Sequence, residues 1–124
     1  MLIAVSSFSA PAPRPPQRAT EPLRVLLIFS EGKDLPGNVL LEQAVRTAFD
    51  QGSSKRAEFY TEHLDASRFS DEAHYRIFRD YLGAKYAGQE PDLLLIIMAR
   101  DFSLAERLPV ELFPKVPAVF VQSF

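Results

Sequence analysis

The chain has 124 residues, of which 47% are hydrophobic and 24% charged, and its formal net charge is −2. These totals predict one soluble globular domain with a single core, and the scattered Lys and Arg residues argue against a nucleic-acid partner. Because cysteine is absent, disulfides, thiolate nucleophiles and zinc thiolate sites are excluded.

The first 21 residues differ in composition from the rest of the chain. A short apolar stretch at residues 2–5 precedes the proline-rich segment SAPAPRPPQ, in which Ala10-Pro11-Ala12 has the small-x-small form of a signal cleavage site. Three interpretations stay open: a shortened export signal, a flexible leader, or residual cloning sequence. In each, we expect residues 1–21 to be disordered, because a proline-rich polar chain buries too little surface to order itself. Residues 22–124 then form one α/β lobe.

Two strands flank a helix in the first half of this lobe. The continuous apolar run Leu23–Phe29 predicts a buried strand. Apolar residues at i, i+3, i+4 spacing predict a helix over Pro36–Gln51, and its apolar face comprises Leu41, Ala44, Val45, Ala48 and Phe49. Ala57–Leu64 is a more polar strand, typical of a sheet edge, so we expect its Glu58 and Glu62 to face solvent.

A second helix and a second buried strand follow. Ser70 is the predicted N-cap of a helix that runs to about Ala87, and Gly88 suits the left-handed position after it. The predicted inward stripe of this helix comprises Ile77, Phe78, Tyr81 and Leu82. Leu93–Met98 has no polar alternation, which indicates a strand buried on both faces. A short helix and a final strand are expected at Ser103–Leu108 and Ala118–Gln122.

This alternation of strands and helices predicts an α/β fold. We expect a three-layer, Rossmann-like (flavodoxin-like) parallel sheet with helices on both faces and the strand order 2-1-3-4, numbering the four strands along the chain. The carboxyl ends of Leu23–Phe29 and Leu93–Met98 then flank a crevice at the switch point, where open α/β sheets bind ligands. The last strand would have an open edge, which favours self-association.

The candidate ligand-binding residues lie in the two loops at this crevice. They are Ser30, Glu31, Gly32 and Asp34 after the first strand, and Arg100, Asp101 and Phe102 after the third. A guanidinium at Arg100 fits a two-point contact with a carboxylate ligand. The alternative is that Arg100 and Asp101 pair and cap the short helix. The first loop also has an alternative as an ordinary turn, because Asp, Pro and Gly are common turn residues.

The sequence shows no motif for catalysis, a cofactor or a metal. It contains neither a P-loop, nor a dinucleotide-binding turn, nor a nucleophile elbow. His63 and His74 are isolated and fit surface or capping roles better than metal ligation. Glu31, Asp34 and Asp101 lack the adjacent acids and the lysine of a phospho-acceptor receiver. We therefore expect no enzyme activity, no cofactor and no metal.

Four motifs within residues 23–120 together carry a resemblance to a known family. They are S-E-x-x-D-L-P-G-N at residues 30–38, E-F-Y-x-E-x-L-D-x-S-R-F at 58–69, K-Y-A-G-x-x-P-D-L at 85–93, and L-F-P-x-V-P-x-V-F at 112–120. This combination resembles the extracytoplasmic sensor region of certain bacterial sensor histidine kinases. That region is similar to the substrate-binding proteins of ABC transporters, which have the type I periplasmic-binding fold.

The resemblance implies a periplasmic, ligand-binding lobe of a receptor in the inner membrane. Cleft residues would map onto Ser30, Glu31, Asp34 and the loop after the third strand, where Met98–Phe102 replaces the Gly- or Pro-containing turn usual in the family. A complete two-lobed domain needs roughly twice this length, so the chain corresponds to the first lobe only. The implied partner is a small-molecule solute, with membrane contact only through a parent protein of a two-component system.

The resulting functional hypothesis is a small-molecule-sensing lobe of a signal-transduction receptor, without catalysis in this chain. Two alternatives stay open. The first is the solute-binding component of an ABC transporter, which would share this lobe and differ only in the sequence that follows. The second is a flavodoxin-like interaction module that binds no small ligand.

Overall fold

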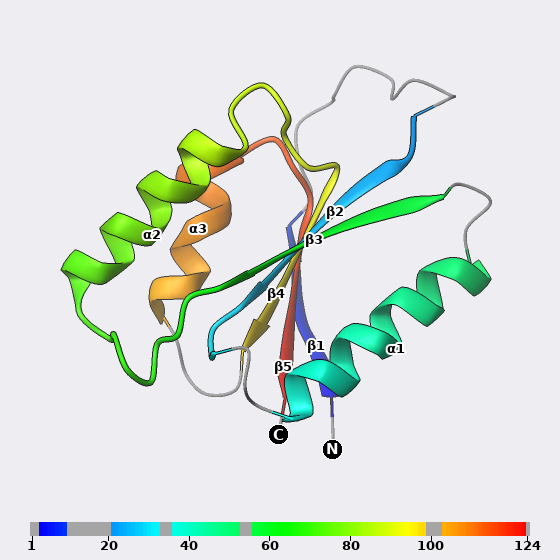
Figure 1. Ribbon diagram of the computed structural model, residues 1–124, viewed down its shortest axis with the longest axis horizontal. Coiled ribbons are helices and arrows are strands. Elements are labelled where there is room, and N and C mark those ends of the chain that lie inside the picture. The colour runs from blue at the N-terminus through cyan, green and yellow to red at the C-terminus, as the bar shows by residue number, and fades with distance from the viewer. Residues whose placement is uncertain (1–2, 10–20, 33–35, 53–55, 99–102, 124) are drawn as a thin grey trace.

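The computed structural model describes residues 3–9, 21–32, 36–52, 56–98 and 103–123. Within these residues, a five-stranded sheet lies between α1 on one face and α2 and α3 on the other (Figure 1). The elements in chain order are β1 (Ile3–Ser9), β2 (Leu23–Phe29), α1 (Pro36–Gly52), β3 (Ala57–His63), α2 (Glu72–Lys85), β4 (Leu93–Met98), α3 (Ser103–Leu112) and β5 (Ala118–Ser123).

The strands lie across the sheet in the order β1-β5-β4-β2-β3. Strands β3, β2, β4 and β5 are parallel, which is the predicted order 2-1-3-4. The chain therefore has the predicted three-layer α/β fold of Rossmann-like (flavodoxin-like) type. Strand β2 is central, because its Leu27 pairs with Thr61 of β3 on one side and with Leu95 of β4 on the other. Strand β3 is an edge strand, as its polar composition predicted.

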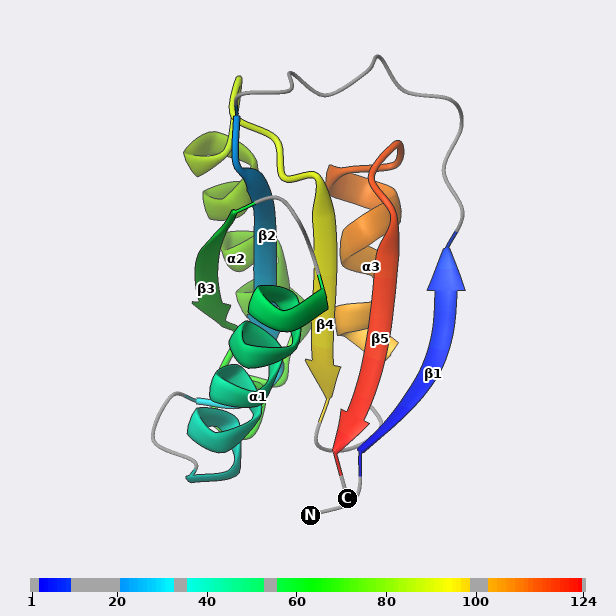
Figure 2. The same ribbon diagram turned by 90° about the vertical axis from the view of Figure 1, so that its right-hand side faces the viewer.

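The central strands are buried on both faces, as their continuous apolar runs predicted. Figure 2 shows β2 between α1 on one side and α2 and α3 on the other. In β2, Val25, Leu27 and Phe29 belong to the core cluster under α1, whereas Leu26 and Ile28 belong to the cluster under α2 and α3. The five side chains are all between 0% and 1% exposed. Full burial of such a side chain contributes about 1.5–3 kcal/mol. This strand is therefore a major source of stability for both layers.

Strand β1 lies in the segment that we expected to be outside the fold. It pairs antiparallel with β5, from Ile3 opposite Ser123 to Ser9 opposite Ala118, with an irregularity between Val5 and Ser7. The expectation of disorder is thus wrong for residues 3–9, whereas residues 10–20 lie outside the described part of the chain. The predicted open edge of the last strand is also wrong. Unpaired strand edges favour pairing, and here β1 occupies the edge of β5.

The apolar face of α1 is narrower than predicted. Leu41 is buried, and Val45 and Phe49 are partly buried in the core above β2, whereas Ala44 and Ala48 are exposed. The three contacting residues are spaced four apart, so they form a single row along the helix. Helix α1 therefore touches the sheet along one line and leaves its flanks open to solvent.

The inward face of α2 also differs from the prediction. Ile77 is 67% exposed and Tyr81 is 49% exposed, whereas Tyr75 and Leu82 are buried and Phe78 packs against the core. At 100° per residue, Tyr75, Phe78 and Leu82 share one side of the helix, and Ile77 lies more than a quarter-turn away. The predicted apolar stripe began at Ile77, whereas the buried face of the helix begins two residues earlier, at Tyr75.

The ends of α2 and α3 differ slightly from those predicted. Asp71, not Ser70, is the N-cap of α2, and its carboxylate accepts a hydrogen bond of 2.8 Å from the backbone N–H of His74. The helix ends at Lys85, two residues before the predicted end, and Gly88 has the expected left-handed φ of 76°. Helix α3 continues past the predicted end, with Pro109 inside it.

A pair of substitutions on α2 tests which face of the helix is buried. Leu82→Ala should lower the free energy of unfolding by about 2–5 kcal/mol, because it removes a fully buried side chain and leaves a cavity. Ile77→Ala, on the exposed face, should change it by less than about 0.5 kcal/mol. Urea denaturation followed by circular dichroism measures both values. Equal losses would contradict the observed orientation of α2.

The N-cap of α2 should stabilise the protein in a pH-dependent way. The hydrogen bond from the His74 backbone holds the pKa of Asp71 below its usual range. Asp71 therefore makes its full contribution to the free energy of unfolding above its unfolded-state pKa of about 3.9. That contribution is lost as the pH falls through the lower pKa that Asp71 has in the folded protein. Asp71→Ala should lower the Tm more than Ser70→Ala at neutral pH. The Tm gap between wild type and Asp71→Ala should narrow in acid, and a constant gap would contradict the cap.

Candidate functional site

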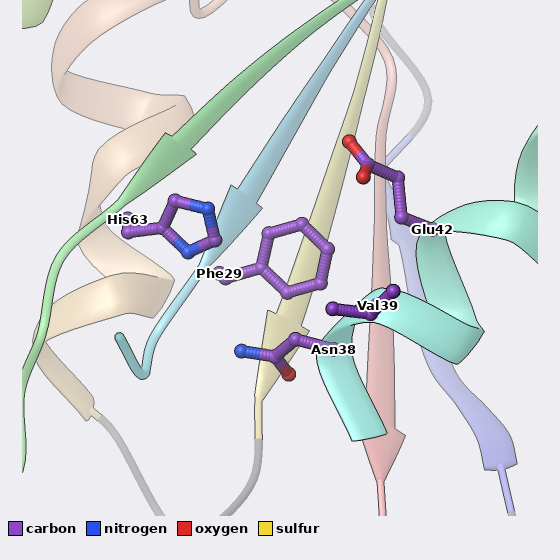
Figure 3. A pocket seen from close by; sticks show the side chains of 5 residues that line it. All are labelled: Phe29, Asn38, Val39, Glu42 and His63. Carbon is purple, nitrogen blue, oxygen red and sulfur yellow. The ribbon is translucent and has the colours of Figure 1, made fainter. Parts of the chain in front are cut away.

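A cavity of about 210 Å³ lies where the carboxyl ends of β2 and β3 meet the first turns of α1. Figure 3 shows its lining, which consists of Phe29, Asn38, Val39, Glu42 and His63. Sites for drug-sized ligands enclose roughly 300–1,000 Å³. The cavity therefore fits a small solute or one group of a larger molecule.

Parallel pairing brings the two rings of the cavity together. Phe29 and His63 are the last residues of their strands, and they are direct partners in the register of β2 and β3. Their rings stack with centroids 5.0 Å apart and an angle of 16° between the planes. The ladder continues beyond the strands, since the Leu64 amide donates to the Phe29 carbonyl at 2.8 Å. The rings therefore stand on a fixed part of the sheet.

The loop after β2 is tied to three neighbouring elements. The Ser30 amide donates to the Ile97 carbonyl of β4 at 2.9 Å, and the Ser30 carbonyl accepts from the Ala66 amide at 2.7 Å. The side-chain amide of Asn38 in α1 donates to the Gly32 carbonyl at 3.1 Å. These bonds hold the loop between β4, α1 and the segment after β3. The backbone of residues 30–32 is therefore preorganised before any ligand binds.

Glu31 is a buried acid in this loop, with 5% of its surface exposed. Its Oε2 accepts a hydrogen bond from the Ser67 hydroxyl. Its Oε1 is buried and has no hydrogen-bond partner in the described part of the chain. A buried polar atom without a partner is costly and uncommon in native proteins. Glu31 thus offers an acceptor that the surrounding protein leaves unused.

The polar lining of the cavity is fixed by specific hydrogen bonds. His63 Nδ1 lies 3.3 Å from the Glu31 carbonyl oxygen. Because a carbonyl oxygen only accepts, Nδ1 must carry the proton. Glu42 Oε1 accepts from the Thr61 hydroxyl at 2.6 Å and from Arg46 Nη2 at 3.4 Å. The carboxylate of α1 is in this way anchored to β3.

Gly32 and Asp65 approach each other closely beside Glu31. A Cβ atom at Gly32 would lie 3.1 Å from Asp65 Oδ1. Asp65 itself has a left-handed φ of 59°, a conformation that Asp adopts more readily than most residues. A side chain at position 32 would therefore require the Asp65 carboxylate to shift by a few tenths of an ångström.

The predicted site residues are only partly described by the structure. Ser30, Glu31 and Gly32 lie at the carboxyl end of β2, as expected, and Ser30 and Glu31 are buried. Asp34, Arg100, Asp101 and Phe102 lie outside the described residues. The crevice between β2 and β4 and the roles of Arg100 therefore stay predictions. The observed cavity lies on the other side of β2, toward β3 and α1.

Sequence reasoning missed the residues that line this cavity. His63 was assigned a surface or capping role, and Asn38 and Glu42 were not singled out. One signal was present, because Phe29 ends one predicted strand, His63 is the last residue but one of another, and these strands were expected to be neighbours. Parallel neighbours place their carboxyl ends at the same edge of a sheet. The register that makes them direct partners could be read only from the structure.

A second group of titratable side chains lies between β3 and α2. Glu62 is 6% exposed, so the expectation that it faces solvent is wrong. It pairs with Lys85 at 2.8 Å and accepts from the Tyr81 hydroxyl at 3.1 Å. The bond to Glu62 raises the pKa of Lys85, which keeps the amine protonated and removes it as a nucleophile. Burial raises the pKa of Tyr86 to about 12, so its hydroxyl stays neutral. This group links β3 to α2.

Three comparisons with known proteins were made. A scan against protein-family models, a search of the curated proteins and a search of the solved structures all find no match to this chain. Among the described residues, no helix combines the length and apolar character needed to cross a membrane. In the same part of the chain, His, Cys, Asp and Glu side chains form no group of three or more suited to a metal ion. Function is therefore inferred from the fold and the cavity.

The contact between Gly32 and Asp65 can be tested by a double-mutant cycle. Gly32→Ala should lower the free energy of unfolding, because the new Cβ forces the Asp65 carboxylate to move. In an Asp65→Gly background there is no carboxylate to displace, so the same substitution should cost less. We expect a coupling energy of about 1 kcal/mol from urea denaturation of the four proteins. Strictly additive losses would contradict the close approach.

Proposed function

We propose that this chain is the small-molecule-binding lobe of an extracytoplasmic sensor in a bacterial signalling receptor of the histidine-kinase type. The observation that carries the proposal is the cavity at the carboxyl ends of β2 and β3, where a stacked ring pair meets polar side chains. Open α/β sheets bind ligands at this edge because the loops that follow parallel strands converge there. No catalytic step is proposed for this chain.

The order of the surrounding backbone supports a binding role. The loop of Ser30 and Glu31 is bonded to β4, to α1 and to the segment after β3. A site that is ordered before binding loses little conformational entropy when the ligand arrives. Glu31 Oε1, which is buried without a described partner, supplies an unused acceptor in the same loop. These features suit recognition of a polar solute.

Two of the motifs that carry the resemblance meet at this site. The first, residues 30–38, contains Glu31 and Asn38, and the second, residues 58–69, contains Ser67 and surrounds His63. The Ser67 hydroxyl donates to Glu31, so the two motifs are joined by a hydrogen bond. This contact gives a structural reason for the two motifs to occur together. It supports, by geometry, the expectation that residues of the first loop belong to a ligand cleft.

The proposed mechanism is closure of a second lobe over the cavity. Val39 on the cavity wall is 49% exposed, so a solute bound by this lobe alone would still face water. A second lobe would cover the solute and bury it. Because the ligand would bind the closed arrangement more tightly than the open one, it would shift the population toward closure. That shift would be the signal passed to the attached output domain.

A cavity-filling substitution tests whether this site binds solutes. Val39→Trp should fill the cavity, whereas Leu40→Trp adds the same side chain at the next position of α1, which is 61% exposed and does not line the cavity. In a thermal-shift screen of pooled small solutes, at least one pool should raise the Tm of wild type and of Leu40→Trp. The same pool should not stabilise Val39→Trp. If no pool stabilises wild type, the alternative of an interaction module without a ligand gains support.

The receptor role is tested by the genomic sequence downstream of codon 124. The sensor proposal expects a second α/β lobe, an apolar helix long enough to span a membrane, and a kinase core. A second lobe without a kinase core would favour the transporter component instead. The absence of a second lobe would contradict both of these functions, because neither could close around a solute.

A further inference from the structure

We infer that the cavity between β2, β3 and α1 selects a small organic cation that carries a primary ammonium group. This inference rests on the proposed function, because it concerns the ligand of the same site. It comes from the polar atoms of the lining, in which hydrogen-bond acceptors outnumber donors. Figure 3 shows the polar ends of His63, Asn38 and Glu42 arranged around the ring of Phe29.

His63 presents an acceptor when its ring is neutral. Its Nδ1 donates to the Glu31 carbonyl, so the proton of the neutral ring is on that nitrogen. Nε2 then carries a lone pair, and it has no partner in the described part of the chain. The ring is held in its plane by stacking on Phe29, which is 1% exposed. The acceptor therefore has a fixed direction.

Glu42 supplies the charge of the lining. Both of its hydrogen bonds, from Thr61 and from Arg46, go to Oε1, which leaves Oε2 available to a ligand. Arg46 pairs with Oε1 and also lies with its guanidinium carbon 4.6 Å from the centre of the Phe59 ring, so it offsets part of the Glu42 charge without lining the cavity. Among the described residues that line the cavity, Glu42 is the one charged group, and no Lys or Arg is present.

Asn38 adds an acceptor that is oriented by the loop. Its Nδ2 donates to the Gly32 carbonyl, which fixes the amide so that Oδ1 is the acceptor. Oδ1 has no described partner, and Nδ2 keeps one further hydrogen. The described residues of the lining thus offer acceptor atoms on Asn38, Glu42 and His63 against this single donor hydrogen.

An ammonium group matches this arrangement better than the alternatives. It carries three N–H donors and a positive charge, and it has no acceptor of its own. A carboxylate or phosphate would face Glu42, and the described residues of the lining include no Lys or Arg to pair with it. A hydroxyl would bring one donor and no charge. Val39 provides exposed apolar surface for a short aliphatic body beside the buried Phe29 ring.

The amino-terminal end of α1 opposes the binding of a cation in this cavity. Helix amino ends carry a partial positive charge and favour anions. Asn38 and Val39 belong to the first turns of this helix. An anion bound at the cavity would show that the helix end outweighs Glu42. The experiment therefore includes an anion of the same shape as the cation.

A matched set of probes tests the inference by NMR. Wild-type protein labelled with ¹⁵N is titrated with n-butylammonium, n-butanol and butyrate, which share a four-carbon body and differ in the polar end. Butylammonium should give saturable shifts of the Asn38 side-chain amide and the Val39 backbone amide. Butanol should bind about tenfold or more weakly, and butyrate should leave these signals unshifted.

Two charge-removing variants of α1 serve as a matched pair. Glu42→Gln keeps the size of the side chain and an oxygen for Thr61 but removes the lining charge, so it should weaken butylammonium binding about tenfold and leave butanol unchanged. Asp50→Asn removes the same charge from the same helix, about 12 Å further along its axis. Butylammonium should bind this control as it binds wild type. Equal weakening in both variants would overturn a specific ion pair.

The other outcomes separate this inference from the proposed function. If butyrate or butanol shifts the Asn38 and Val39 signals and butylammonium does not, the cation inference is overturned while a solute site remains. If none of the probes shifts them, the cation inference is also overturned, and the cavity-filling test with Val39→Trp decides the function independently. If Glu42→Gln does not fold, the ranking of the three probes on wild type is decisive by itself.

Discussion

The pairing of β2 with β3 and β4 is the constraint on which the rest of the molecule depends. Val25, Leu26, Leu27 and Ile28 are 0% exposed, so this strand is the centre of both cores. Because both neighbours run parallel to it, the carboxyl ends of three strands lie at one edge of the sheet. The ladder extends past the strand ends through the Ser30 amide and the Leu64 amide. Both the position and the rigidity of the candidate site follow from this pairing.

The helices cover the two faces unequally, and this shapes the site. Helices α2 and α3 lie together on one face, whereas α1 is alone on the other (Figure 1). Helix α1 contacts the sheet through the single row of Leu41, Val45 and Phe49. This row orients the helix so that Asn38 and Glu42 come to the carboxyl ends of β2 and β3. A helix packed more broadly would have filled the space that the cavity occupies.

Buried polar groups serve different purposes in two parts of the protein. Glu62 is paired with Lys85 and bonded to Tyr81, and such a satisfied group holds β3 to α2. Glu31 has one satisfied oxygen and one oxygen without a described partner. The Tyr86 hydroxyl is also buried without a described partner, but its raised pKa keeps it neutral and its desolvation cost is smaller than that of a carboxylate. The unsatisfied oxygen of Glu31 is the reason why the proposed ligand site includes the loop after β2.

Hydrophobic periodicity in the chain was sufficient for the fold class, the strand order and most element ends. The reason is that runs such as Leu23–Phe29 and Leu93–Met98 have only one stable environment, between two layers. Periodicity did not predict the pairing of β1, the buried face of α2 or the partner of Glu62. Each of these depends on which element of the folded chain packs against the residues concerned. The register that stacks Phe29 on His63 joins residues 34 positions apart in the sequence, and no local pattern encodes it. The cavity between β2, β3 and α1 was therefore set by packing in three dimensions.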